Sequence, residues 1–196
     1  DPIGCAARGD APPRALDRAL LSRLNDPRDL PFAHLMLSFA AVQLPFAAVL
    51  FIPGVFRWWL ALLYLGVLFI GYFDRLILML HNTSHRMLFK KKHRLLNRII
   101  PWVLCPFFGQ SPDTYFSHHL GMHHPENNLE DDLSSTMPYQ RDNFLHFIHY
   151  YLVFVFTGIP RTYAYLMRTH RERLARQLVI GELAFFALLG VTVALA

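Results

Sequence analysis

The feature that most constrains the fold is a series of apolar segments long enough to cross a membrane. Residues 31–52 form a run that only His34 and Gln43 interrupt appreciably, and a helix of about twenty residues covers the ~30 Å hydrocarbon layer. Further apolar stretches cover residues 57–80 and 178–196. Since 54% of the 196 residues are hydrophobic and only 17% are charged, the sequence predicts an all-α integral membrane protein.

The chain divides into a polar N-terminal segment, residues 1–31, and a membrane domain, residues 32–196. Pro53 and Gly54 mark a turn, so the first two spans should form a tight helical hairpin. We expect the second helix to continue past Phe73 and to carry His81 and His85 out of the bilayer. The basic run at residues 90–94 follows at once, and basic residues beside a span predict the cytoplasmic side for the N-terminal segment and for the histidines.

Two other apolar stretches are expected not to cross. Residues 99–109 are too short for a span, and residues 144–160 would deliver an arginine-rich stretch, 161–177, to the outer side against the positive-inside rule. We therefore interpret 99–109 as an interfacial segment on the cytoplasmic side, place 144–160 in the inner leaflet or against the protein, and make 161–177 cytoplasmic.

Composition excludes several functional classes. Cys5 and Cys105 lie a hundred residues apart, so neither a disulfide framework nor a cysteine-based zinc site is expected. The formal charge of +5 arises from basic residues beside apolar segments, which favours anionic lipid headgroups as neighbours and argues against nucleic acid.

Two histidine clusters carry the chemistry. His81 and His85 are four residues apart, as are His119 and His123, and His124 adds a third donor to the second cluster. Side chains at i and i+4 share a helical face with Cβ atoms about 5–6 Å apart, and imidazole nitrogen suits iron, copper, zinc or nickel. The spacing predicts a metal site with these five histidines as ligands.

Three further histidines leave their roles open. His118 is either an extra ligand or only a neighbour of His119, while His146 and His149 form a pair on an aromatic segment where burial and hydrogen bonding are the simpler interpretation. A set of carboxylates follows the second cluster and could supply a ligand, orient the imidazoles or form a solvated loop. These are Glu126, Glu130, Asp131 and Asp132.

The two clusters resemble the histidine boxes of the integral-membrane fatty acid desaturase family. The segment 81–85, H-N-T-S-H, is similar to that family's H-x-x-x-H box, and 119–124, H-L-G-M-H-H, is similar to its H-x-x-x-H-H box. We call them the first box (His81 and His85) and the second box (His119, His123 and His124). Their order, and the helical hairpin before the first box, match the family as well.

The resemblance implies a membrane-bound oxidoreductase that uses O₂ and two non-haem iron ions to desaturate a fatty acyl chain of a membrane lipid or acyl carrier. The five histidines of the boxes would be metal ligands, and an external electron donor, ferredoxin-like or cytochrome b5-like, would supply electrons. No residue is assigned a catalytic role apart from metal binding.

Other functions are compatible with parts of this pattern. The segment 81–86 also resembles the first box of membrane alkane hydroxylases, so hydroxylation of an alkane or acyl chain is the alternative reaction. A metal transporter or metal-sensing membrane protein would need ligands within the bilayer, whereas the clusters lie beyond the predicted spans. The family's third box, H-x-x-H-H, has no counterpart here, because His146 and His149 are followed by Tyr150. We therefore expect a C-terminally incomplete domain, and no turnover by this segment alone.

Overall fold

The computed structural model describes residues 14–52 and 54–195, and within these ranges the chain is helical with no named strand. This confirms the all-α prediction. The chain forms two compact units: the first reaches Gly109 and takes in the last residues from Thr192, and the second comprises Gln110–Val191.

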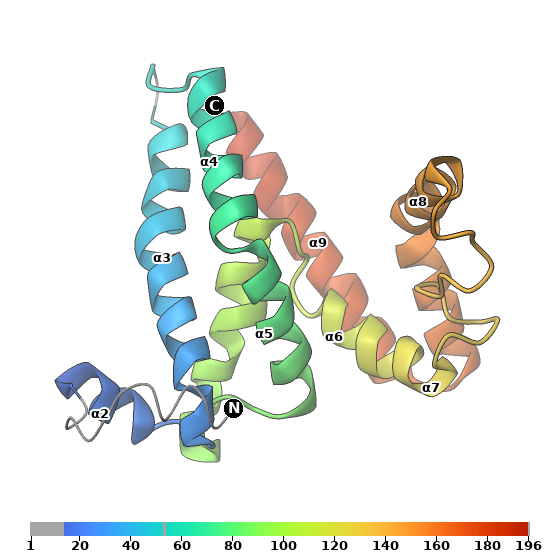
Figure 1. Cartoon of the computed structure of the whole chain (residues 1–196), viewed down its shortest axis with the longest axis horizontal. Helices are drawn as coiled ribbons and strands as arrows, with labels where there is room; N and C mark the ends of the chain where they lie inside the picture. Colours follow the sequence, from blue (N-terminus) through green and yellow to red (C-terminus); the bar gives the residue numbers. More distant parts are fainter. Residues whose placement is uncertain (1–13, 53, 196) are drawn as a thin grey trace. The chain divides into compact units, whose positions relative to one another are not determined.

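The first unit begins with α2 (Ala15–Leu21) and a 3₁₀ turn, η1 (Pro27–Asp29), which leads into the long apolar helix α3 (Leu30–Leu50). A proline occupies the first turn of α3, where its missing N–H has no helical partner to lose. Helix α3 packs along α4 (Trp58–Gly71), and the two run side by side in Figure 1. The predicted helical hairpin is therefore present.

The second apolar stretch differs from the expected continuous helix. Helix α4 ends at Gly71, Tyr72 leaves helical geometry at φ −134°, and α5 (Phe73–His85) continues in a direction bent by 56°. Tyr72 is held at this point because its hydroxyl bonds Ser38 Oγ at 2.8 Å and its ring packs edge-on against Phe39. Tertiary contacts to α3 thus break a pattern that is locally helical throughout.

Short turns η2 (Lys91–Arg98), η3 (Ile100–Leu104) and η4 (Cys105–Phe108) complete the first unit. Several apolar residues of η3 and η4, which contact α3, are buried, and Leu104 is fully enclosed, whereas Val103 is exposed. The Tyr64 hydroxyl on α4 donates to the Phe107 carbonyl at 2.6 Å. The segment 99–109, expected at the interface, therefore contributes to the core of its unit.

The second unit contains α6 (Thr114–His118), a π-helical turn η5 (His119–His123), α7 (His124–Glu126), α8 (Phe144–Arg168) and all but the last residues of α9 (Glu172–Leu195). Its core joins the π-turn to the end of α8 and the start of α9. The buried residues of this core are Met122, Tyr165, Leu166, Ala175 and Leu178.

Helix α8 is longer than the sequence pattern indicates. It passes through Pro160 and ends at Arg168, so the stretch 161–177 is divided between α8, a three-residue turn and the first residues of α9. His170 makes that turn with a left-handed φ of +57°. Large apolar side chains such as Phe144, Leu145 and Phe156 are each more than 70% exposed on α8.

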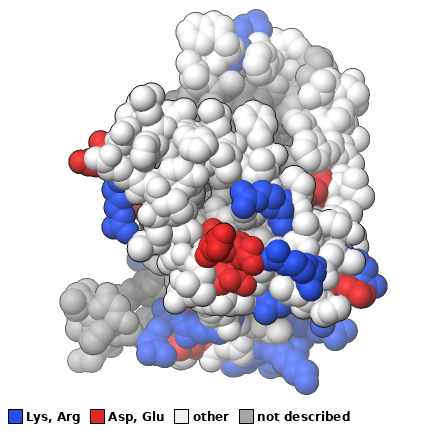
Figure 2. Space-filling model, turned by 90° about the vertical axis from the view of Figure 1, so that its right-hand side faces the viewer, with Lys and Arg blue, Asp and Glu red and all other residues white. Residues whose placement is uncertain are grey.

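Two helical stretches, Pro27–Leu50 and Glu172–Ala194, are long and apolar enough to cross a membrane, and the bent pair α4 and α5 could form a third. In the part of the chain that the structure describes, α8 does not meet this criterion. On the face that Figure 2 shows, acidic and basic side chains gather next to one another toward the centre and the lower part, and wide areas above them carry few charged side chains. A largely uncharged surface of this kind suits contact with lipid.

Candidate metal centre

The first box lies on the last two turns of α5. That helix buries Leu76, Met79 and Leu80, and at about 100° per residue His81 and His85 face roughly the opposite side. Both histidines are exposed, with ring centroids 5.0 Å apart and one ligand nitrogen of each within 4.8 Å of the other. The structure thus brings the two predicted ligands together within the first unit.

The end of the first box is anchored by the segment that precedes α3. Arg86, next to His85, forms ion pairs with Asp26 at 2.8 Å and with the buried Asp29. The Asn25 side chain donates to the carbonyl oxygen of Met87 at 2.6 Å. Residues 25–29 therefore hold the chain just after the pair of predicted ligands.

Electrostatics in this anchor work in opposite directions on its two carboxyl groups. Hydrogen bonds from Arg28 hold the pKa of Asp26 well below its usual range. Burial raises the pKa of Asp29, although the nearby Arg86 opposes the rise. The buried carboxylate of Asp29 therefore depends on Arg86 for its compensation.

The second box is wound as a π-helical turn, His119–His123. In an α-helix, His123 would lie about 40° and His124 about 140° around the axis from His119. A π-turn has about 4.4 residues, so the same two side chains fall about 33° to one side and about 49° to the other. The local winding therefore places all three imidazoles on one face, which spacing in an α-helix would not do.

The three rings of the second box lie close together. The Nε2 atoms of His119 and His124 are 3.0 Å apart, and the ring centroids of His119 and His123 are 5.5 Å apart with nearly parallel planes. Two imidazole nitrogens bound about 2.1 Å from one metal at a right angle are separated by about 3.0 Å. The pair His119 and His124 therefore fits two adjacent positions around a first-row metal ion.

Packing fixes the π-turn in its unit. Met122 enters the core, and Gly121 is the point of closest approach, since a Cβ there would come within 2.7 Å of Leu166 Cδ2 and 2.9 Å of Leu174 Cδ1. The Arg171 side chain donates to the Gly121 carbonyl. Two of the three residues between His119 and His123, Gly121 and Met122, thus serve packing, and His119 is itself buried beside them.

Of the four carboxylates after the second box, Asp132 is the one in contact with a predicted ligand. Its side chain is fully enclosed, and its Oδ2 lies 2.8 Å from His123 Nδ1. Burial by itself would raise the pKa of Asp132, but hydrogen bonds from Ser134, Asn128 and His123 outweigh it and lower that pKa. Sequence reasoning did not single out Asp132 or Ser134; the signal was an Asp followed two residues later by Ser, which is typical of an Asx turn.

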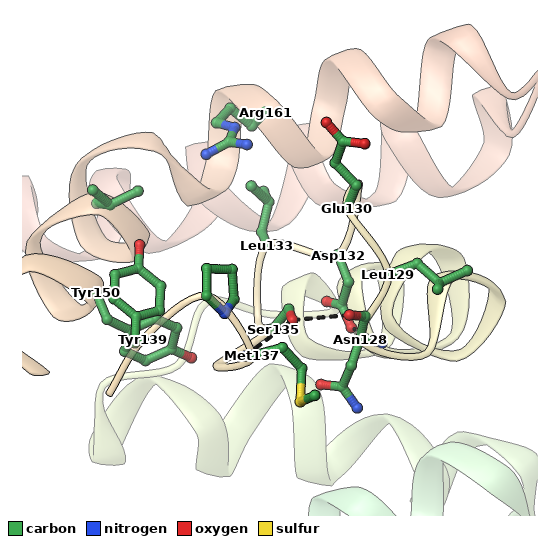
Figure 3. Close-up of a pocket in the computed structure, with 12 residues that line it drawn as sticks. Asn128, Leu129, Glu130, Asp132, Leu133, Ser135, Met137, Tyr139, Tyr150 and Arg161 are labelled. Carbon is green, nitrogen blue, oxygen red and sulfur yellow. Dashed lines mark hydrogen bonds between the residues drawn. The ribbon is translucent and has the colours of Figure 1, made fainter. Parts of the chain in front are cut away.

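The other three carboxylates have different surroundings. Glu126 accepts a hydrogen bond from the Tyr165 hydroxyl, Asp131 pairs with Arg168, and Glu130 is exposed. Asp132 also forms part of the wall of a cavity of about 300 Å³ between the loop 128–139 and α8, with Asn128 beside it (Figure 3). The acidic segment is therefore an ordered structure around one buried carboxylate.

The histidines whose roles were open are also placed. His118 has a buried Nε2 with no hydrogen-bond partner, its ring packs edge-on against Phe154, and burial lowers its pKa. His146 accepts a hydrogen bond at Nδ1 from the Gln140 backbone N–H at 2.9 Å. The His149 ring lies 5.7 Å from that of Tyr139. His146 thus makes a hydrogen bond of the kind that the simpler interpretation predicts, whereas His149 is exposed and makes a ring contact, so burial is not observed for it.

These observations define a class of protein before any comparison. The chain is helical, has stretches apolar enough to cross a membrane, and carries two histidine groups with the nitrogen donors that first-row metals prefer. The fatty acid desaturase family model matches residues 56–196, well over half of the chain, so the chain belongs to the fatty acid desaturase family. Comparison with curated proteins and with solved structures gave no match.

Proposed function

We propose that this protein is an O₂-dependent desaturase that introduces a double bond into a fatty acyl chain of a membrane lipid or acyl carrier. The observation that carries the proposal is the second box, in which a π-turn gathers three imidazoles and sets two Nε2 atoms 3.0 Å apart. Family membership supplies the reaction type. The overall change removes two hydrogens from adjacent methylene groups, and with two electrons and two protons it reduces O₂ to two waters.

The ligands in this proposal are the five histidines of the two boxes, and the cofactor is two non-haem iron ions. Bound iron would supply the oxidising power that an unactivated C–H bond requires. The protein contributes neutral nitrogen donors, and it orients them through the packing of α5, the π-turn and the contact between His123 and Asp132.

The substrate and redox partner follow from the same reasoning. Large apolar side chains are exposed along α4 and α9, among them Ile70 at 89% and Leu183 at 65%, which supports delivery of an acyl chain from the lipid phase. Because the reaction consumes two electrons per double bond, an external donor of the ferredoxin or cytochrome b5 type is required. We place the boxes on the cytoplasmic side, where the basic residues beside the spans favour them.

The test combines metal analysis with product analysis of the full-length protein purified in detergent. We expect about two iron atoms per chain, because the proposed cofactor is two iron ions held by imidazole nitrogens. His85→Ala and His123→Ala should each lower the iron content and abolish the unsaturated product while leaving membrane insertion intact.

His149→Gln is the matched control, because this histidine lies outside both boxes and packs against Tyr139. It should retain iron and product. Mass spectrometry of the acyl chains distinguishes a double bond from an added hydroxyl group. Stoichiometric zinc without iron in aerobically active protein would contradict the proposal, and a hydroxylated product would assign the chain to the alternative reaction.

A further inference from the structure

Both carboxylate oxygens of Asp132 accept hydrogen bonds within its own loop. Its Oδ2 accepts from the Asn128 backbone N–H at 2.9 Å, and its Oδ1 accepts from the Ser134 backbone N–H at 2.9 Å and from the Ser134 hydroxyl at 2.7 Å. His123 Nδ1 lies 2.8 Å from Oδ2. A carboxylate with no exposed side-chain surface is thus satisfied on both oxygens.

The hydrogen bonds around Asp132 determine which ring nitrogen of His123 carries a proton. The one proton of the Ser134 hydroxyl is directed to Asp132. The Ser134 oxygen also lies 2.9 Å from His123 Nδ1, and from that nitrogen it can only accept a hydrogen bond. An ionised carboxylate also only accepts. The proton between these groups must therefore come from His123 Nδ1, and in the neutral imidazole this leaves the Nε2 lone pair unprotonated.

We propose that Asp132, assisted by Ser134, is a positioning residue that holds His123 in the tautomer whose Nε2 is free to bind a metal ion. The inference rests on the proposed function of the histidine boxes. The ring nitrogen that carries the proton is set by the hydrogen bond it makes, and carboxylates that orient metal-binding imidazoles typically change metal affinity by about 10–100-fold when replaced.

The informative variant is Asp132→Asn, because an amide cannot satisfy the donors that surround this position. In either orientation its NH₂ group faces a backbone N–H, that of Asn128 or that of Ser134. Ser134→Ala is milder, since it removes one of the two acceptors at His123 Nδ1 and leaves the carboxylate. Glu130→Gln is the matched control, because it removes the same charge from an exposed side chain two residues away.

The first measurement needs no metal. Nitrogen NMR of histidine-labelled, metal-free, full-length protein reports which ring nitrogen is protonated, and the His123 signals are assigned by their loss in His123→Ala. We expect protonated Nδ1 in the wild type and in Glu130→Gln, and partial or complete transfer of the proton to Nε2 in Asp132→Asn. Thermal unfolding of each variant identifies samples that have lost their fold. If Asp132→Asn does not fold, Ser134→Ala is compared with the wild type in its place.

The second measurement is an anaerobic titration with ferrous iron alone. Affinity should fall about 10–100-fold in Asp132→Asn, by less in Ser134→Ala, and within about twofold of the wild type in Glu130→Gln. Protonated Nε2 on His123 in the wild type, or an Asp132→Asn variant with unchanged tautomer and affinity, would overturn the inference. A wild type with protonated Nδ1 that binds no iron would support the positioning role and contradict the proposed function.

Discussion

At the scale of single residues, Arg86 links the first box to the segment before α3. It pairs with Asp26 and with Asp29, whose side chain is 4% exposed. The pairing compensates a carboxylate that water does not reach. Loss of Arg86 would leave that carboxylate buried with its charge opposed only weakly.

Arg86→Gln is therefore expected to destabilise the protein by about 1–3 kcal/mol at neutral pH, the usual cost of a buried group left without its partner. Because burial already raises the folded-state pKa of Asp29 above 3.8, the contribution of this group is most favourable at low pH and declines as pH rises through that folded-state pKa. The deficit of Arg86→Gln should therefore be smaller in mild acid than at neutral pH. Thermal unfolding in detergent at several pH values measures both effects.

Arg28→Gln provides the comparison for this prediction. Arg28 also pairs with Asp26, but its side chain is 67% exposed, and exposed ion pairs contribute about 0–1 kcal/mol. An equal loss in the two variants, or a deficit of Arg86→Gln that grows in mild acid, would show that Asp29 is not the group that Arg86 compensates.

The candidate ligands were predictable from the sequence, and the residue that supports His123 was not. Histidines four residues apart can be found in the sequence without a structure. His81 lies close to His85 in the first unit, and His119 lies close to His124 in the second. Asp132 is one of four similar carboxylates in the sequence. Only the loop conformation, with Asn127 and Asn128 at positive φ, decides which carboxylate turns inward.

At the scale of elements, α9 makes one very close backbone approach within its unit, at Gly181. A Cβ added at Gly181 would lie 1.7 Å from the Pro112 carbonyl oxygen, and the next residue, Glu182, bonds Thr114 Oγ1 at 2.8 Å. A backbone atom cannot move aside as a flexible side chain can. This contact therefore requires glycine.

Gly181→Ala should separate α9 from residues 112–114 and lower the unfolding temperature markedly, with a cost of about 1–3 kcal/mol or more from overpacking. Gly190→Ala is the control on the same helix, since a Cβ there meets nothing within 4 Å, and alanine favours a helix over glycine by about 0.5–1 kcal/mol. Thermal unfolding of both variants in detergent checks the prediction. Similar losses in the two would mean that helix propensity, and not the approach to Pro112, controls this position.

Element types were predicted better than element boundaries. Hydropathy identifies α3 and α9 because their length and composition exceed the threshold for a span. The break at Tyr72 was missed because it results from contacts to Ser38 and Phe39 on another helix. The continuity of α8 through Pro160 was missed because an internal proline ordinarily kinks or ends a helix, whereas α8 continues past it to Arg168.

At the scale of the whole molecule, the orientation in the membrane is set by where the basic residues lie. Five arginines occur between residues 161 and 177, around the turn that joins α8 to α9. The positive-inside rule predicts that this turn is cytoplasmic and that α8 does not cross. Exposed apolar side chains on α8 are consistent with a helix at the membrane surface.

An Arg173→Cys variant, made without Cys5 and Cys105, tests this topology. Arg173 is exposed at the start of α9, so an impermeant thiol reagent should label it only after the cytoplasmic side is opened. Phe56→Cys, in the turn between α3 and α4, should be labelled in intact cells. Labelling of Arg173→Cys in intact cells would mean that α8 crosses the bilayer and that α9 runs inward.

The π-helical turn of the second box has a consequence for how such motifs vary in length. In an ordinary α-helix, the spacing H-x-x-H-H places its two later imidazoles about 60° to one side and about 40° to the other side of the first. The π-turn at His119–His123 gives the imidazole rings nearly the same angular spread around the helix axis, although one more residue separates the first histidine from the second. A single-residue insertion inside a metal-binding helix can therefore be absorbed as a local widening of the helix, so that motifs of different length present interchangeable sets of donors.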